Sequence, residues 1–222
     1  MNNNNSKITK QIKKMNLRVS IGNNTSHSFL SDPARFSFSL SRYKFVAKMF
    51  EGFNEVLEVG AGDGFKSTIV GQFCKNLTLS DLELENQKEY DRTKVKKFKF
   101  ILNDFTKTSL KKKYDGIYLL DVLEHISKKK ENLFLTNLKK SLKTNGSIII
   151  GMPSLESQKY ASKLSKLGHI NCKTKKELRK FLYRHFNNVY LFSMNDEVVH
   201  TGFDKMSHYI LAIANSKKKR AT

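Results

Sequence analysis

The stretch VLEVGAGDG, residues 56–64, decides how the surrounding sequence is interpreted. Its first four residues form a short, mostly apolar run of strand length, and its three glycines permit a tight turn whose backbone can approach a ligand closely. A helical pattern carrying Phe65, Ile69 and Phe73 comes next. The segment therefore predicts a strand, a glycine-rich turn and a helix. Its G-x-G-x-G spacing disfavours an NAD-dependent dehydrogenase, whose turn has the spacing G-x-G-x-x-G.

Outward from this unit, short apolar runs continue to alternate with helical patterns. Such alternation predicts parallel strands covered by helices. Two runs near the C-terminus are joined by a connection too short for a crossover helix, so we expect those strands to be antiparallel to each other. The further runs occupy residues 77–79, 98–102, 116–120, 147–150, 189–194 and 207–214. The sequence thus predicts one α/β domain over residues 32–215, with a doubly wound, mostly parallel seven-stranded sheet and an antiparallel terminal strand.

Two helix starts are marked by their capping residues. Asp32 precedes Pro33, which is the arrangement of an N-cap residue before a proline at the first helical position. Thr174 and Glu177 have the spacing of a capping box. We expect a helix to begin at each of these points.

Three segments lie outside the predicted sheet and its helices. Residues 1–31 contain no acidic residue and no apolar core of a secretory signal, so we expect a disordered basic arm. A stretch rich in serine and lysine, residues 154–174, is predicted to be a lid of loops or short helices over the sheet. Residues 216–222 are predicted to be a basic tail.

The composition narrows the class of protein. Hydrophobic residues make up 39% of the 222 residues, and there are 2 cysteines; this is enough apolar surface for a core and too little cysteine for a disulfide scaffold. No run approaches the roughly 18 apolar residues of a membrane-spanning helix, so we expect a soluble, cytoplasmic protein. The formal charge of +21 suits a phosphate-rich partner. Because the lysines are spread along the chain and arginine is scarce, we favour solvated faces over a nucleic-acid groove.

Polar residues follow the predicted strands, where an open α/β sheet binds its ligands. Glu58 precedes the first glycine, Asp81 ends the second strand, and Asn103 and Asp104 follow the third. Asp81 lies at a suitable distance downstream for a carboxylate that accepts hydrogen bonds from ribose hydroxyls. The fourth strand is followed by DVLEH, residues 121–125. These groups make one edge of the sheet the candidate ligand site.

This ordered series resembles the class I S-adenosylmethionine-dependent methyltransferases. VLEVGAGDG is similar to their first motif, LSD to their ribose-binding acid, LNDF to their adenine-contacting acid and YDGIYLLDVLEHI to their fourth-strand motif. The resemblance implies a Rossmann-like fold with S-adenosylmethionine as cofactor. It also implies that the backbone of residues 60–64 cradles the methionine part, that Asp81 binds the ribose and that Asp104 contacts the adenine amino group. Arg42, on the helix before the first motif, is a candidate for the cofactor carboxylate. The cofactor-binding residues expected on this basis are Arg42, Glu58, Gly60, Ala61, Gly62, Gly64, Asp81, Leu82, Asn103, Asp104 and Asp121.

Glu124 and His125 are the candidate catalytic pair. Because the methyl donor is already activated, the protein must mainly position the acceptor and remove its proton, and His125 suits the role of general base. The alternative for His125 is a structural hydrogen bond.

A different interpretation of this pair adds Asp121 and His169. The pattern D-x-x-E-H with a later histidine is similar to the metal-assisted O-methyltransferases of ubiquinone biosynthesis and to those that modify the 3′-terminal 2′-hydroxyl of small RNAs. In those enzymes Glu-x-x-Glu-His and a later histidine hold a divalent cation. Asp121 is one methylene shorter than glutamate, and the lid that carries His169 is long enough to lie elsewhere. We therefore favour the general base over a metal site.

The predicted reaction is O-methylation of a small hydroxylated acceptor, such as a sugar or glycoconjugate. Polar residues between the last two strands are candidates for the acceptor side, and His169 and His200 are further catalytic candidates. These polar residues are Asn195, Asp196, Glu197, His200 and His208. Two other functions stay open: RNA ribose 2′-O-methylation, which the charge favours, and a non-catalytic cofactor-binding module that regulates a partner. The sequence does not predict the oligomeric state.

Overall fold

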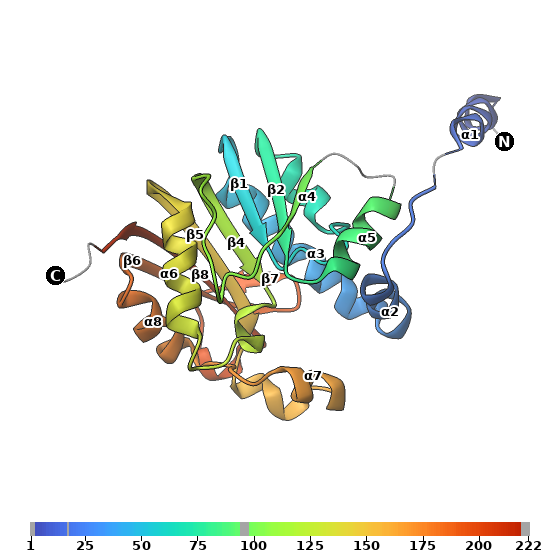
Figure 1. The fold of residues 1–222 in the computed structure, drawn as a ribbon. Helices are drawn as coiled ribbons and strands as arrows, with labels where there is room; N and C mark the ends of the chain where they lie inside the picture. Colours follow the sequence, from blue (N-terminus) through green and yellow to red (C-terminus); the bar gives the residue numbers. More distant parts are fainter. Residues whose placement is uncertain (1–2, 17, 94–97, 219–222) are drawn as a thin grey trace.

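The central strands are apolar at successive positions, so both of their faces must be covered. The computed structural model describes residues 3–16, 18–93 and 98–218. Within these residues one sheet has the order β3-β2-β1-β4-β5-β8-β6-β7 (Figure 1). Its strands are β1 (Glu55–Val59), β2 (Asn76–Asp81), β3 (Lys99–Leu102), β4 (Tyr114–Leu120), β5 (Leu142–Pro153), β6 (Phe186–Asn195), β7 (Val198–His200) and β8 (Tyr209–Lys217).

Strand direction agrees with the sequence-based expectation. The five neighbouring strands β3, β2, β1, β4 and β5 are mutually parallel, and β8 pairs antiparallel with both β5 and β6. The predicted fold class is confirmed. The described sheet has eight strands instead of the expected seven, because the chain turns at Asp196, where φ is +51°, and the short β7 folds back on β6.

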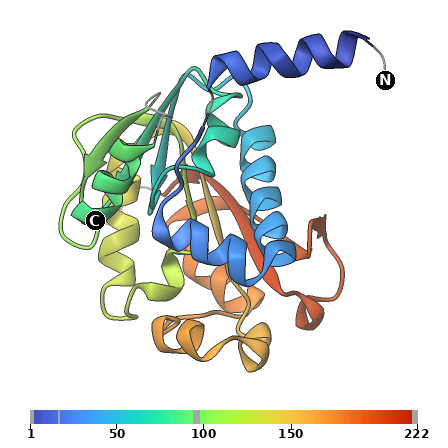
Figure 2. The same cartoon turned by 90° about the vertical axis from the view of Figure 1, so that its right-hand side faces the viewer.

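Two helical layers enclose the sheet (Figures 1 and 2). Leu57 and Val59 of β1 join the core formed with α6 (Glu131–Ser141) and α8 (Lys175–Tyr183). Val56 faces the opposite core, because successive side chains of a strand point to opposite faces. That second core includes side chains of three helices. They are α3 (Pro33–Met49), α4 (Ser67–Gly71) and α5 (Leu84–Arg92).

Both predicted helix starts are confirmed. The Asp32 carboxylate accepts a hydrogen bond from the Arg35 N–H at 2.9 Å, and α3 begins at Pro33. Thr174 and Glu177 form a complete capping box at the start of α8.

The N-terminal segment differs from the expected disordered arm. Residues 1–31 contain α1 (Asn3–Met15) and α2 (Asn23–Ser31) in their described part. Long-range hydrogen bonds explain the order of α2: the Gly22 N–H donates to Asp63 Oδ2 at 2.6 Å, and the Asn23 N–H donates to Glu89 Oε1 at 3.1 Å. Helix α1 stands away from the rest of the chain in Figure 1.

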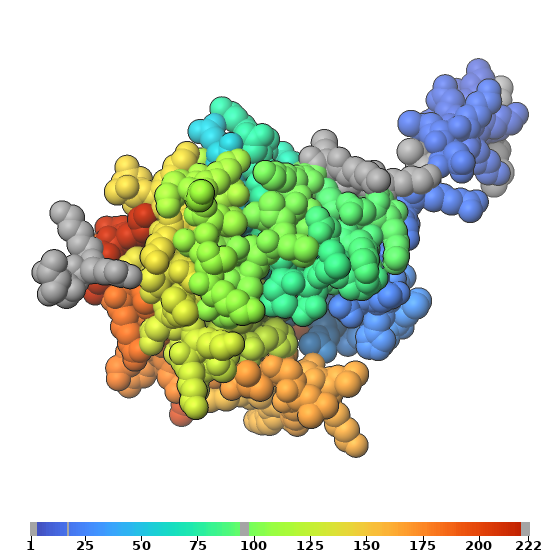
Figure 3. Space-filling view, in the orientation of Figure 1, coloured from blue at the N-terminus to red at the C-terminus, as the bar shows by residue number. Residues whose placement is uncertain are grey.

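The predicted lid, residues 154–174, consists of a 3-10 helix η2 (Glu156–Tyr160) and α7 (Lys163–Gly168). A parallel bridge between Ser154 and Lys173 joins its two ends. In the space-filling view the lid lies at the lower rim of the molecule (Figure 3). The start of the predicted basic tail, residues 216–222, belongs to β8, which runs to Lys217; residues 219–222 lie outside the described residues.

The order of the strands in the sheet reverses between β1 and β4, and this reversal indicates where a ligand site lies. An open α/β sheet binds ligands at such a switch point, beyond the carboxyl ends of the strands. A Cβ added at Gly60, just after β1, would collide with Cγ2 of Val122, just after β4. The loops that follow the two strands are therefore in direct contact.

Candidate active site

The turn after β1 has the backbone conformation that its glycines allow. Gly60, Gly62 and Gly64 have φ values of +76°, +58° and +69°, a region that other residues rarely adopt. A Cβ added at Gly62 would meet no atom within 4 Å. The backbone at Gly62 therefore borders open space, as a turn that cradles a ligand requires.

Asp81, at the end of β2, is fixed by backbone amides. Its Oδ2 accepts from the Gly62 N–H at 2.9 Å and its Oδ1 from the Glu83 N–H at 3.0 Å. Each carboxylate oxygen keeps acceptor capacity beyond these bonds. The predicted ribose-binding acid thus lies against the glycine turn in a fixed position, next to the exposed Leu82.

Glu58 is a buried carboxyl group beneath the turn. It is 1% exposed and accepts hydrogen bonds from the hydroxyls of Tyr43 at 3.1 Å and Tyr118 at 2.5 Å. Burial raises the pKa of Glu58 to about 7, although the hydrogen bonds from Tyr118 and Tyr43 lower it.

Asp121 and Arg42 form an ion pair where β4 ends. Asp121 has a φ of +58°, and its Oδ2 and Oδ1 lie 2.8 and 3.1 Å from Nη1 of Arg42. The guanidinium of Arg42 also stacks on Tyr209, 3.8 Å from the ring centroid. Burial alone would raise the pKa of Asp121, but the positive charge of Arg42 holds it below its usual range. The structure therefore pairs Arg42 with Asp121, whereas the sequence suggested a partner for the cofactor carboxylate.

Asp104, after β3, organises a turn. Its Oδ1 accepts from the N–H and the hydroxyl of Thr106 at 2.8 and 2.7 Å, and its Oδ2 lies 3.2 Å from Lys107 Nζ. Partial burial would raise the pKa of Asp104, but these partners lower it. Asn103 Nδ2 donates across the same segment to the Thr108 carbonyl at 3.4 Å. These contacts fit a turn-forming role, which competes with the expected adenine contact.

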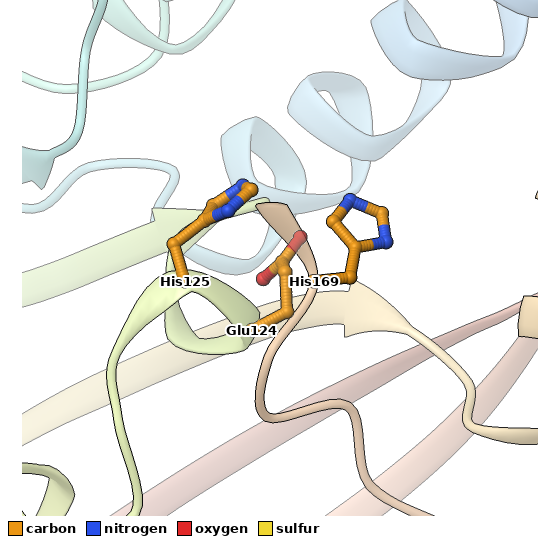
Figure 4. Close-up of side chains that lie close together, drawn as sticks. All are labelled: Glu124, His125 and His169. Carbon is orange, nitrogen blue, oxygen red and sulfur yellow. The ribbon is translucent and has the colours of Figure 1, made fainter. Parts of the chain in front are cut away.

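Glu124, His125 and His169 lie together at the carboxyl end of β4 (Figure 4). One ligand atom from each side chain lies within 4.8 Å of the others, and the two imidazole centroids are 5.3 Å apart. Glu124 is completely buried in the 3-10 helix η1 (Leu123–His125). Among the described residues neither of its carboxylate oxygens has a hydrogen-bond partner. Burial, and then the charge of Asp121, raise the pKa of Glu124 well above its usual range.

The hydrogen bonds of the two histidines define which nitrogen is available. His125 Nδ1 lies 2.9 Å from the Gly168 carbonyl oxygen, and His169 Nδ1 lies 2.8 Å from Gln158 Oε1. Because both oxygens only accept, each Nδ1 donates its hydrogen, and in a neutral imidazole ring Nε2 is then the nitrogen with the lone pair. This geometry overturns the expectation that the lid takes His169 elsewhere. Asp121, which the alternative metal interpretation placed in the same set, is paired with Arg42 instead.

Within the described chain, His200 does not belong to the cluster of Glu124, His125 and His169. Its ring contacts Asn195 Oδ1 at 3.1 Å and accepts from the Gly202 N–H at 2.9 Å, both inside its own hairpin. Its strand β7 is separated from β4 by three other strands. Asp196, Glu197 and His208 are exposed, as expected for a solvated connection.

Sequence reasoning missed three residues around the site. Lys66 lies among charged groups: burial lowers its pKa, whereas Asp121 raises it. Gln158 orients His169, and Asn171 bonds the backbone on both sides of His125. Lys66 comes directly after the glycine turn, and this position could have identified it as a site residue. The sequence offered no such indication for Gln158 and Asn171, because their partners are distant in the sequence.

Comparison with known proteins identifies the class. A family model described as "Methyltransferase domain" matches residues 32–204, and the chain belongs to that family. Together with the fold and the glycine turn, this makes the chain an S-adenosylmethionine-dependent methyltransferase, as the sequence predicted. No curated protein sequence matches the chain.

Solved structures share the fold at low sequence identity. The N-methyltransferase NodS from Bradyrhizobium japonicum WM9 in complex with S-adenosyl-l-homocysteine has a TM-score of 0.61 and 16% identity, covering 80% of this chain and 85% of NodS. The methyltransferase domain of bacterial CtHen1-C has a TM-score of 0.67 and 14% identity, covering 80% and 98%. The plantazolicin methyltransferase BpumL, in complex with a monoazolic desmethylPZN analog and S-adenosylhomocysteine, has a TM-score of 0.63 and 16% identity, covering 86% and 93%.

Proposed function

We propose that this methyltransferase transfers the methyl group to a hydroxyl of a polar acceptor, and that Glu124, His125 and His169 hold a divalent cation on the acceptor side. One observation carries the proposal. The Glu124 carboxylate is completely buried without a partner in the described chain, and in Figure 4 it lies between two imidazoles that are each held through Nδ1. An unpaired buried carboxylate is costly, and a cation offsets that cost.

The donor set fits a divalent metal ion. One carboxylate and two neutral imidazoles suit Zn²⁺ or Mn²⁺, and three protein ligands leave positions open for an acceptor. A bound cation would supply the positive charge that lowers the pKa of an acceptor hydroxyl. The protein's own residues keep the set in place: the Gly168 carbonyl and Gln158 Oε1 contact the Nδ1 atoms and so fix the orientation of both rings. This set resembles that of the metal-assisted O-methyltransferases, with Asp121 left out.

On the donor side, we assign the methionine part of S-adenosylmethionine to the backbone of residues 60–64 and the ribose to Asp81. The open space at Gly62 and the fixed carboxylate of Asp81 support this assignment. Lys66 is the basic side chain next to the turn, and because Arg42 is paired with Asp121, we assign Lys66 in its place as the partner for the cofactor carboxylate.

Chelation tests the cation. With EDTA, turnover should be abolished, and Mn²⁺ or another divalent ion should restore it. His125→Ala and His169→Ala should each lower kcat by a factor on the order of 10² or more, because either change opens the same ligand set. His200→Ala is the matched control and should retain activity, since its contacts lie within the β6–β7 hairpin.

A different result would support the general-base hypothesis instead of the cation. If chelation has no effect and only His125→Ala inactivates the enzyme, His125 is a general base and the cation proposal is wrong. Direct titration of the purified protein with Mn²⁺, followed by electron paramagnetic resonance, checks binding independently of turnover.

A small hydroxylated acceptor such as a sugar remains our first proposal, and RNA ribose is the second. Basic side chains on α8, and on segments that lie beside it, favour RNA. They line two cavities, of about 190 and about 440 Å³. Those side chains include Lys128, Lys173, Lys175, Lys176, Arg179, Lys180 and Arg184. Methyl transfer from labelled donor to a panel of sugars, and to RNA with a 3′-terminal ribose or 2′-deoxyribose, separates the two acceptors.

A further inference from the structure

We propose that α1 binds the surface of an anionic membrane through a stripe of apolar side chains, with lysines on the remaining circumference of the helix. This inference is independent of the methyl acceptor. Every side chain from Asn4 to Asn16 is exposed, and α1 stands away from the body in Figures 1 and 3. The helix is therefore available to a partner along its whole described length.

The apolar residues of α1 lie on one side. Ile8, Ile12 and Met15 follow each other at steps of four and three residues, which places them within about 60° around a helix of 3.6 residues per turn. Their exposed fractions are 53%, 57% and 62%. Such a stripe is unfavourable in water, and it has the width of a face that dips into the headgroup and acyl boundary of a bilayer.

The charges of α1 lie on the remaining circumference. Lys7, Lys10, Lys13 and Lys14 fall outside the apolar stripe, and residues 1–31 contain no acidic residue. Lysines in this arrangement reach anionic headgroups while the apolar side chains enter the membrane. The helix would lie on the surface without crossing it: its 13 residues are too short, and none of the helices in the described ranges is long and apolar enough to span a membrane.

The positive charge of α1 and its apolar stripe together favour an anionic membrane over other binding partners. A nucleic acid would engage the lysines and leave Ile8 and Ile12 in water. A second copy of α1 would bring like charges together, because the helix has no acidic partner for its lysines. An anionic bilayer satisfies both faces at once.

The test is flotation of the full-length protein with vesicles. We expect binding to vesicles of phosphatidylcholine with about 30 mol% phosphatidylglycerol to exceed binding to phosphatidylcholine alone at least about tenfold. Ile8→Ser combined with Ile12→Ser should reduce the binding about tenfold or more with the lysines unchanged. Lys7→Gln, Lys10→Gln and Lys14→Gln together should reduce it by a similar factor.

A control of equal charge distinguishes α1 from the protein's overall charge. Lys111→Gln, Lys129→Gln and Lys130→Gln remove an equal number of charges from exposed loops and should leave vesicle binding unchanged. The proposal is wrong if this control loses as much binding as the α1 lysine variant. It is also wrong if the Ile8→Ser/Ile12→Ser protein binds like wild type, or if α1 lysines govern binding to an RNA oligomer but not to vesicles.

Discussion

Glu58 makes stability depend on pH. Its pKa of about 7 in the folded chain exceeds the value of 4.5 for a free glutamate, chiefly because of burial. A raised pKa means that the folded state holds the proton more tightly than the unfolded state. The stability that this group contributes is therefore complete below pH ~4.5 and is lost as the pH rises through about 7.

We expect Glu58→Gln to remove this pH dependence. As the pH rises from about 5 to about 8, the free energy of unfolding of the variant should increase relative to that of the wild type by roughly 2 to 3 kcal/mol. Urea unfolding across this range measures it. Glu55→Gln removes a partly exposed carboxylate from the same strand and should keep the wild-type pH profile. Parallel pH profiles for the wild type and Glu58→Gln would contradict the prediction.

Asp81 should control the affinity for the donor. Asp81→Ala removes the proposed charged acceptor for the ribose and releases the Gly62 N–H. We expect S-adenosylmethionine to bind roughly 10- to 100-fold more weakly, about 1.5 to 3 kcal/mol, as measured by isothermal titration calorimetry. Asp91→Ala, on the exposed side of α5, should bind normally. Unchanged affinity in Asp81→Ala would remove Asp81 from the donor site.

At the scale of elements, one segment joins the lid to η1. The N–H of Asn171 donates to the Glu124 carbonyl at 2.9 Å, and its Nδ2 donates to the Ile126 carbonyl and to Glu131 Oε2, each at 2.8 Å. Lys173 completes the network with an ion pair to Glu131 at 2.7 Å. These bonds fix the backbone on both sides of His125 while the same segment carries His169. Asn171 is therefore a positioning residue for the proposed metal set.

Asn171→Ala should weaken Mn²⁺ binding and lower turnover by about 10- to 100-fold, the usual effect of removing a group that orients metal ligands. Thr174→Ala is the control, since it breaks the capping box of α8 and costs about 1 kcal/mol of stability without contacting Glu124. Thermal unfolding and Mn²⁺ titration of both variants separate the two effects. If both lose stability and neither loses Mn²⁺ affinity, Asn171 is only structural.

At the scale of the whole molecule, the charge of +21 implies attraction to any polyanion. If this is general electrostatics, binding to a generic RNA oligomer should fall by about 10³-fold or more between about 50 and about 200 mM salt, because each phosphate contact releases counterions. Fluorescence anisotropy at both salt concentrations measures it. Submicromolar binding to one particular RNA that survives the higher salt would instead favour the RNA acceptor.

The sequence by itself determined how strands and helices follow one another along the predicted domain. It also determined the glycine turn after β1 and the two helix starts at Asp32 and Thr174. These features depend on periodicity, turn conformation and capping, which are properties of neighbouring residues. The acids at the strand ends were also visible, because a parallel sheet brings the carboxyl ends of its strands to one edge. The disordered arm was a wrong expectation, since the hydrogen bonds that order α2 come from Asp63 and Glu89.

Only the tertiary structure decided which of the polar groups meet. Arg42 reaches Asp121 across 79 positions, and His125 meets the Gly168 carbonyl across 43. No local pattern encodes these contacts, because they depend on how the lid returns to the sheet and on which helix covers which strand end. The same holds for Glu124, whose carboxylate is buried without a partner among the described residues where the lid packs against η1. The sequence therefore indicated the proposed donor side of the site, because the glycine turn is local and a parallel sheet brings the acids at its strand ends to one edge. The fold decided the proposed acceptor side, because only the folded chain brings His169 of the lid to Glu124 and His125.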